Sequence, residues 1–311
     1  MIVLHPISGP PAREGSYEPG LPQSGCQATA FPSVIPNAST VHVFARMGGL
    51  RDTGLAQSRE RSRAAPDKPS RDRLTTGNQI FKHLPRAVID ALSPWLEQVS
   101  LAQGDSLYEP GDEVTHAYFP LNGMVVTLVL PMRDGRAVEA ATVGREGVLE
   151  GFVSLDPKPS FVRTTVQIGG DAVRIPIERL EKAKRSVPEL HDILSRYTDC
   201  LMADVLQSVG CASIHPLEAR CARWLLMAHD RVRQSDLPLT QEALAETFGV
   251  ARTYMTRIAR SLQKRGAISY SRGIIQITNR DVLEDAACEC YRAVRGHFDR
   301  VLPGLYPDAE P

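Results

Sequence analysis

LTQEALAETFGVARTYMTRIARSLQKRG, residues 239–266, carries the most specific structural signal in this chain. Thr240 can cap a helix over residues 241–247, and Glu242 suits the first turn of that helix. Gly249 supplies a turn conformation that other residues resist, and the small Ala245 lets a second helix approach. Apolar residues recur at the spacing of two helices that cross at a steep angle, namely Leu244, Phe248, Val250, Met255, Ile258 and Leu262. This spacing predicts a helix-turn-helix.

The second predicted helix, over residues 251–265, is strongly basic. It carries five basic residues and no acidic residue, in a chain whose formal net charge is +0. Residues near the start of such a helix reach base edges in the major groove, where arginine binds guanine, and residues further along meet phosphates. A basic face that is merely solvated is the alternative. The predicted DNA-contacting residues are Thr240, Gln241, Arg252, Thr253, Tyr254, Thr256, Arg257, Arg260, Lys264 and Arg272.

Two short β runs follow the basic helix, over residues 267–270 and 274–278, and Ser271-Arg272-Gly273 joins them. This pattern predicts a hairpin, or wing, that places Arg272 near the backbone of bound DNA. Residues 281–302 then show a continuous amphipathic pattern, which predicts one closing helix. Its apolar face would consist of Leu283, Ala287, Tyr291, Val294, Phe298 and Val301.

Upstream of residue 176 the pattern is that of short strands. After short helices within residues 78–92, the turn dipeptides Pro110-Gly111, Asn122-Gly123 and Asp134-Gly135 separate β runs at 10 to 12 residue intervals. Such punctuation is typical of an all-β barrel or sandwich, and a β-roll is the economical interpretation. The predicted strands cover residues 99–101, 106–108, 117–119, 124–130, 137–143, 161–168 and 172–175.

After Pro176 the pattern becomes helical, with predicted helices over residues 177–183, 188–213 and 217–232. The long middle helix carries an apolar stripe made of Leu190, Leu194, Tyr197, Leu201 and Val205. This stripe has two interpretations, because it could cover the β-roll of its own chain or form the seam of a two-stranded dimer contact.

Composition and the N-terminal stretch set the remaining bounds. A chain of 311 residues with 42% hydrophobic and 23% charged residues is an ordinary globular one, and its zero net charge excludes a histone-like protein. Residues 1–73 hold nine of the 23 prolines and no lasting period, so we expect a disordered segment or a spurious N-terminal extension. The short apolar start is no signal peptide and no stretch is long enough to span a membrane, so we expect a cytoplasmic chain.

The order of these elements resembles the Crp/Fnr superfamily of bacterial transcription regulators. The resemblance covers residues 78–302, through GDSLYEPG at 104–111, AYF at 117–119, Gly123, and VARTYMTRI at 250–258. It implies an α+β fold with an effector-sensing β-roll at 78–185, a long linker and dimerisation helix at 188–213 and a winged helix-turn-helix at 214–302. Thr253 departs from the family, which usually has glutamate there, and threonine specifies bases only weakly.

The resemblance also implies function and partners. It implies a homodimeric, sequence-specific transcription regulator that binds pseudo-palindromic double-stranded DNA, contacts RNA polymerase and does not bind membranes. Its β-roll would sense an unidentified signal. The alternatives are a regulator that truly responds to a cyclic nucleotide, or a ligand-binding module whose helical half docks a protein. No motif of a nucleotide-hydrolysing, esterase or metalloprotease site occurs, so we expect no enzyme.

The effector site is predicted only loosely. Cyclic-nucleotide members of the family carry a Gly-Glu pair and an Arg-Ser or Arg-Thr pair, whereas here Phe152 follows the key glycine and Arg163-Thr164 lies about one residue out of register. Glu139, Arg145 and Arg163 are the alternative candidates to line a binding site for some other small molecule. The candidate effector residues are Glu139, Arg145, Arg163 and Thr164. No cofactor is evident, and a cyclic nucleotide stays as the alternative.

The cysteines give no metal prediction. Cys26 is the lone cysteine of the N-terminal stretch, where iron–sulfur members of the family need a close-set group. Cys288 and Cys290 are two positions apart on the predicted closing helix, so we expect them to point to nearly opposite faces and to bind no common ion. The eight histidines show no ligand spacing. Haem, which needs only one histidine, stays open.

Overall fold

The computed structural model describes residues 68–133, 137–150 and 158–306. The described chain starts with three short helices, α1 (Arg71–Gly77), α2 (Gln79–His83) and α3 (Arg86–Leu92), and the 3-10 turn η1 (Ser93–Trp95). Ser70 caps α1 and Leu74 is fully buried. Helix α1 therefore begins inside the stretch 1–73 that the sequence predicts to be disordered or spurious, and residues 1–67 of that stretch lie outside the described residues.

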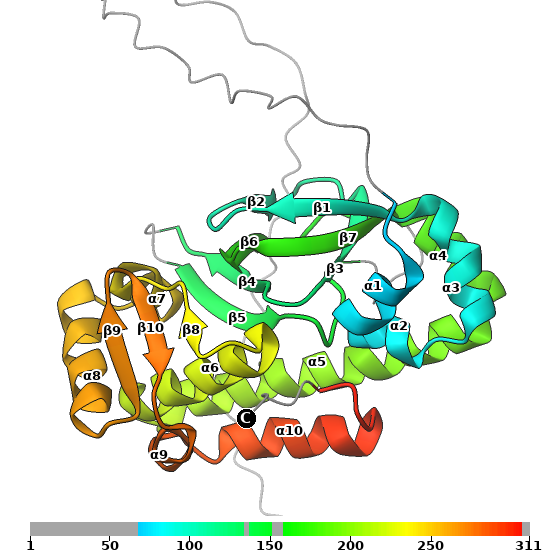
Figure 1. Ribbon diagram of the computed structural model, residues 1–311. Coiled ribbons are helices and arrows are strands. Elements are labelled where there is room, and N and C mark those ends of the chain that lie inside the picture. Colours follow the sequence, from blue (N-terminus) through cyan, green and yellow to red (C-terminus); the bar gives the residue numbers. More distant parts are fainter. Residues whose placement is uncertain (1–67, 134–136, 151–157, 307–311) are drawn as a thin grey trace, which may run out of the picture. The chain divides into compact units, whose positions relative to one another are not determined.

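Seven strands form the predicted β-roll as two antiparallel sheets (Figure 1). The order is β1-β7-β3 in one sheet and β2-β6-β4-β5 in the other. Residues 134–136, between β4 and β5, lie outside the described residues. The strands are β1 (Glu97–Leu101), β2 (Ser106–Tyr108), β3 (His116–Pro120), β4 (Val125–Pro131), β5 (Ala137–Val143), β6 (Arg163–Ile168) and β7 (Gly170–Pro176). Strands followed by helices confirm the predicted α+β class.

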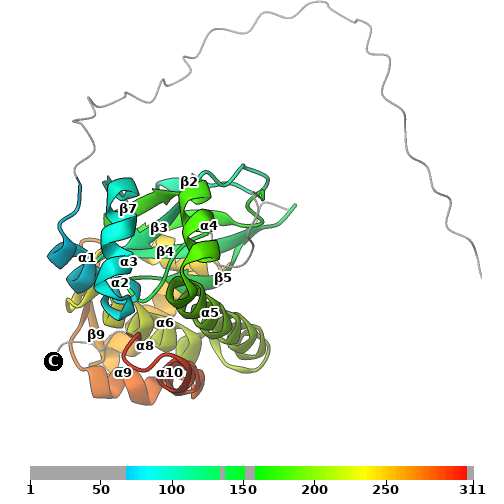
Figure 2. The same ribbon diagram turned by 90° about the vertical axis from the view of Figure 1, so that its right-hand side faces the viewer.

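Three helices continue the chain, α4 (Ile177–Ser186), α5 (Pro188–Ile214) and α6 (Leu217–Val232). Helix α4 lies beside α3 in both views (Figures 1 and 2), where Arg179 stacks 3.6 Å over the ring of Trp95. Helix α5 packs against β5 and α10 (Figure 1). Leu190, Leu194, Tyr197 and Leu201 of its apolar stripe are buried in the core of their own chain. The structure therefore favours the first interpretation of that stripe, in which it covers the roll.

The rest of the described chain forms the helix-turn-helix, the wing and two closing helices. The elements are β8 (Asp236–Leu237), α7 (Gln241–Thr247), α8 (Arg252–Lys264), β9 (Ile268–Ser271), β10 (Ile274–Ile277), α9 (Arg280–Ala286) and α10 (Cys290–Val301). The prediction of a single closing helix over 281–302 is wrong. Ala287 has extended backbone angles, because α9 packs on α6 whereas α10 packs on α5.

A buried ion pair joins α6 to the loop after β5. Arg231 Nε donates a 2.8 Å hydrogen bond to Glu146 Oε1, and both side chains are 2% exposed. The Arg231 guanidinium also donates to the hydroxyl and the carbonyl of Thr142. A Cβ atom at Gly144 would lie 2.6 Å from Arg231 Cγ, so only glycine allows this close approach. The pair therefore connects the roll to the helix that supports the helix-turn-helix.

Candidate nucleic-acid interface

The helix-turn-helix forms as its sequence predicts. The backbone N–H of Ala243 donates a 3.0 Å hydrogen bond to Thr240 Oγ1, which caps α7. Gly249 takes a φ of +63° in the turn, a conformation that disfavours residues with a Cβ atom. Ala245 of α7 and Met255 of α8 are buried. These contacts fix α8 with its basic face turned outward.

The outer face of α8 carries most of the predicted DNA-contacting residues. Its exposed members are Arg252, Thr253, Tyr254, Arg257, Arg260 and Lys264. The Arg252 guanidinium lies 3.7 Å from the carboxylate of Glu242, and both side chains are about two-thirds exposed, at 69% and 65%. An exposed pair of this kind contributes only about 0–1 kcal/mol, so a phosphate or a guanine competes with it easily.

A cation–π contact and the hydrogen bonds of one hydroxyl group hold the side chains of this face in place. The Arg257 guanidinium lies 5.0 Å from the ring centre of Tyr254, within the range of a cation–π contact. Thr256 Oγ1 lies 2.7 Å from Gln241 Oε1 and 3.0 Å from the backbone oxygen of Arg252. Gln241 and Thr256 thus hold α7 against α8, and Thr240 caps α7, so in this structure these three predicted contact residues position the basic face.

Arg272 lies at the tip of the predicted wing. Ser271 pairs with Ile274 across the β9–β10 turn, and Arg272 has a φ of +49°. A positive φ at this position is typical of the two-residue turns that join the strands of a β-hairpin. A Cβ atom at Gly273 would lie 3.5 Å from Thr240 Cγ2, so the wing tip lies next to the start of α7. The exposed Arg272 therefore sits beside the helix-turn-helix.

The four candidate effector residues do not share one site in the described structure. Glu139 and Arg163 both line a cavity of about 140 Å³ next to α7. The Arg163 guanidinium pairs with Glu109 at 2.8 Å. Thr164 is fully buried, with its hydroxyl 3.5 Å from Glu150 Oε1, and Arg145 is buried beside Gln79. An effector site made of all four residues stays a prediction that this arrangement does not favour.

Glu139 instead connects the roll to α6. Trp224 Nε1 donates hydrogen bonds of 2.9 and 3.0 Å to the two carboxylate oxygens of Glu139. Burial raises the pKa of the Glu139 carboxyl from 4.5 to about 7, although the Trp224 hydrogen bond and the Arg223 charge act in the opposite direction. The protonation state of this carboxyl therefore changes near neutral pH.

Glu139 gives the folded chain a specific pH dependence. Between pH 4.5 and about 7 the unfolded chain loses the Glu139 proton while the folded chain keeps it, so the contribution of Glu139 to stability falls as the pH rises. Because glutamine stays neutral, we expect the Tm of Glu139→Gln relative to wild type to increase from pH 5 to pH 8. Thermal unfolding across this range measures the difference, with the exposed Glu178→Gln as control. A Tm difference that stays constant with pH would contradict the assignment.

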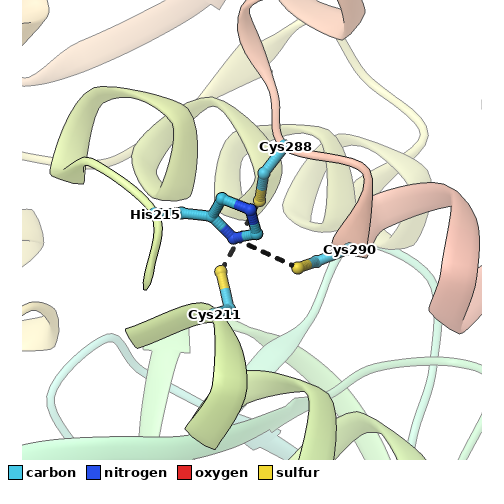
Figure 3. A group of neighbouring side chains, drawn as sticks. All are labelled: Cys211, His215, Cys288 and Cys290. Atoms are coloured by element: carbon cyan, nitrogen blue, oxygen red, sulfur yellow. Dashed lines mark hydrogen bonds between the residues drawn. The ribbon is translucent and has the colours of Figure 1, made fainter. Parts of the chain in front are cut away.

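One cluster of potential metal ligands lies outside the predictions made from the sequence. The side chains of Cys211, His215, Cys288 and Cys290 bring their sulfur and nitrogen atoms within 4.8 Å of one another (Figure 3). The expectation that Cys288 and Cys290 point to opposite faces of one helix is wrong, because Cys288 lies in the break between α9 and α10. The spacings Cys-x-x-x-His at 211–215 and Cys-x-Cys at 288–290 were the available signal.

Comparisons with known proteins agree with the helix-turn-helix geometry described above. Residues 219–286 match the family described as the Crp-like helix-turn-helix domain. The global nitrogen regulator of Synechocystis is 24% identical over 185 residues, which are 56% of this chain and 81% of that protein. The chain therefore carries a Crp-like helix-turn-helix domain. The global nitrogen regulator of Nostoc is 25% identical over 175 residues, 53% of this chain and 77% of that protein.

The structure of FixK2 from Bradyrhizobium japonicum shares the fold of this chain. Its TM-score is 0.52 at 16% identity, over 62% of this chain and 98% of FixK2. Because the Crp-like domain and the relatives are those of transcription regulators, the prediction that the chain is not an enzyme is confirmed. Within the described residues, no helix has both the length and the apolar character needed to cross a membrane.

Proposed function

We propose that this chain is a transcription regulator of the Crp/Fnr type, which binds a specific pseudo-palindromic DNA site as a homodimer and does so in response to a signal that acts through the β-roll. The observation that carries the proposal is the exposed basic face of α8, which has no acidic residue in its first turn. A helix of this charge, held outward by a helix-turn-helix, is the element that enters the major groove in such proteins.

The residues of this face have different proposed roles. Arg252 and Arg257 lie near the start of α8, where side chains reach base edges, and arginine binds guanine O6 and N7 with two hydrogen bonds. Arg260 and Lys264 lie further along the helix and Arg272 at the wing tip, so their proposed partners are phosphates. Two copies of α8 would then enter successive major grooves about 34 Å apart.

The exposed face of α5 supports the homodimer. Met202, Leu206 and Val209 are spaced by four and three residues, and each side chain is more than half exposed, at 54%, 64% and 63%. This is the spacing of a two-stranded seam, and large apolar residues at that spacing are costly to leave in water. The proposed partner is a second copy of the same helix. This seam is a different face of α5 from the stripe that the sequence singles out.

Charge in this seam should separate the subunits. We expect Leu206→Glu combined with Val209→Glu to convert the dimer to a monomer at micromolar concentration, because two copies would bring four carboxylates together in an apolar contact. Light scattering coupled to size exclusion measures the mass. Phe161→Glu, at a site 83% exposed outside α5, is the matched control and should leave the mass unchanged. A dimer that survives the α5 substitutions would contradict the proposed seam.

The proposed signal path crosses the contacts between the roll and the DNA-binding part. Besides Arg231–Glu146 and Trp224–Glu139, Gln167 of β6 donates a 3.2 Å hydrogen bond to Thr247 of α7. A cavity of about 360 Å³ opens at this junction, lined by residues of β5, α5 and α6 that include Glu139 and Arg223. Ligand sites commonly have volumes of about 300–1,000 Å³, so this cavity is our proposed place for a small-molecule effector.

The family likeness also supports RNA polymerase as a partner and the cytoplasm, where the chromosome lies, as the place of action.

Selection of duplexes from a random library by the full chain tests the proposal directly. We expect enrichment of an inverted repeat whose half-site centres lie about 10 base pairs apart. Recovery of random sequences at low salt would contradict specific recognition. Failure to retain any duplex would favour the alternative in which the helical half docks a protein.

A further inference from the structure

Four potential metal ligands converge where α5 meets the C-terminal helices. Cys211 lies in the last turn of α5, and His215 is the residue at which α5 ends. Cys288 lies in the break between α9 and α10, and Cys290 is the first residue of α10. Figure 3 shows the four side chains pointing toward one another from these separate segments. Two pairs of residues, separated from each other by at least 73 positions in the sequence, thus form one cluster.

The distances within the cluster fit one ion. Cys211 Sγ lies 3.5 Å from Cys288 Sγ, and Cys290 Sγ lies 3.5 Å from His215 Nδ1. Sulfurs bound at about 2.3 Å in a tetrahedral zinc site lie about 3.8 Å apart, close to these separations. An iron–sulfur cluster needs room for several irons and sulfides between its ligands, which a group of atoms within 4.8 Å does not offer.

The surroundings of the cluster resemble those of a closed site. The three cysteines are buried, with exposures of 1%, 7% and 0% for Cys211, Cys288 and Cys290. Gln207 Nε2 donates a 3.0 Å hydrogen bond to Cys290 Sγ, and such a donor stabilises a thiolate. His215 Nε2 lies 3.2 Å from Glu289 Oε1. Metal-binding histidines almost always make such a contact from the ring nitrogen that faces away from the metal, and this contact would leave Nδ1 available.

We propose that Cys211, His215, Cys288 and Cys290 bind one Zn²⁺ ion as a tetrahedral structural site. Three thiolates and one imidazole fill all four positions of zinc, so the site has a structural role and no open position for catalysis. The thiols release their protons to solvent when zinc binds. The ion would lock the joint between α5 and α6 to the α9–α10 connection, and so hold the DNA-binding helices at a fixed angle to the long helix.

Metal content of the untagged full-length chain tests the site. We expect one zinc per chain by elemental mass spectrometry after expression in zinc-supplemented medium and gel filtration, and a Tm several degrees lower after chelation. The apoprotein titrated with Co²⁺ should develop the thiolate charge-transfer and tetrahedral ligand-field absorption bands at one equivalent. None of these three readouts involves DNA, so failure of this site would leave the proposed regulator function standing.

Matched variants identify the ligands. Cys290→Ala and His215→Ala should lose most of the zinc, while Cys221→Ala, at a buried cysteine of α6 outside the cluster, should keep it. Circular dichroism checks that each variant is folded. The proposal is overturned if folded wild-type protein takes up neither Zn²⁺ nor Co²⁺, or if Cys290→Ala keeps full zinc content. A Cys211–Cys288 disulfide in the protein purified without oxidant would also overturn it.

Discussion

Arg252→Ala combined with Arg257→Ala should lower the affinity for the selected DNA site by about 30-fold to 10⁴-fold. Each arginine that binds a guanine with two hydrogen bonds contributes about 1–3 kcal/mol of discrimination, and the two side chains lie on the exposed face of α8. Fluorescence anisotropy at fixed salt measures the loss. Affinity for a random duplex should change far less, because the lost contacts are to base edges.

Two other substitutions separate this effect from loss of charge. Arg260→Ala should weaken binding to selected and random duplexes alike and reduce the salt slope by about one, as expected for a phosphate contact. Arg300→Ala removes an exposed arginine of α10 and should change neither affinity. If the Arg252 and Arg257 variants weakened binding to both duplexes equally, their assignment to base recognition would be wrong.

Glu146→Gln should destabilise the chain by about 3–5 kcal/mol, the usual effect of removing one partner of a buried ion pair. The Arg231 guanidinium would stay buried with only neutral acceptors, since its side chain and that of Glu146 are each 2% exposed. For a folded unit of this size, 1 kcal/mol corresponds to about 2–4 °C, so the Tm should fall by roughly 6–20 °C. Differential scanning calorimetry measures this drop.

An exposed ion pair provides the comparison for Glu146→Gln. Asp192→Asn removes one partner of the Arg196–Asp192 pair on α5, whose side chains are 53% and 62% exposed, and should shift the Tm by less than about 2 °C. Adding Arg231→Met to Glu146→Gln should recover part of the lost Tm, because the buried positive charge of the Arg231 guanidinium is then removed. A Tm drop for Glu146→Gln no larger than that for Asp192→Asn would refute the importance of the buried pair.

The helix-turn-helix could be predicted because its signals are local. The cap at Thr240, the turn at Gly249 and the apolar spacing all fall within residues 239–266, and α7 begins and ends where they indicate. The strands of the roll were also marked locally, by turn dipeptides between β runs. Neither prediction required knowledge of which distant segments pack together.

The remaining features depend on tertiary partners. Residues 286–290, AACEC, contain no proline or glycine, so nothing local marks the break that brings Cys288 and Cys290 together. That break exists because α9 and α10 pack on different helices. The apolar stripe of α5 likewise indicates that this face is buried, but the sequence pattern does not indicate which element covers it. The candidate effector residues failed to converge for a related reason, since sequence order does not show that Glu139 faces Trp224 of α6.

Recognition of a particular DNA sequence by this chain can be tested with a single ratio of affinities. It is the ratio of affinities of the full chain for the selected inverted repeat and for a random duplex of equal length, measured by anisotropy at the same salt concentration. We predict a ratio of about 10³ or more. Equal affinities for the two duplexes would contradict it.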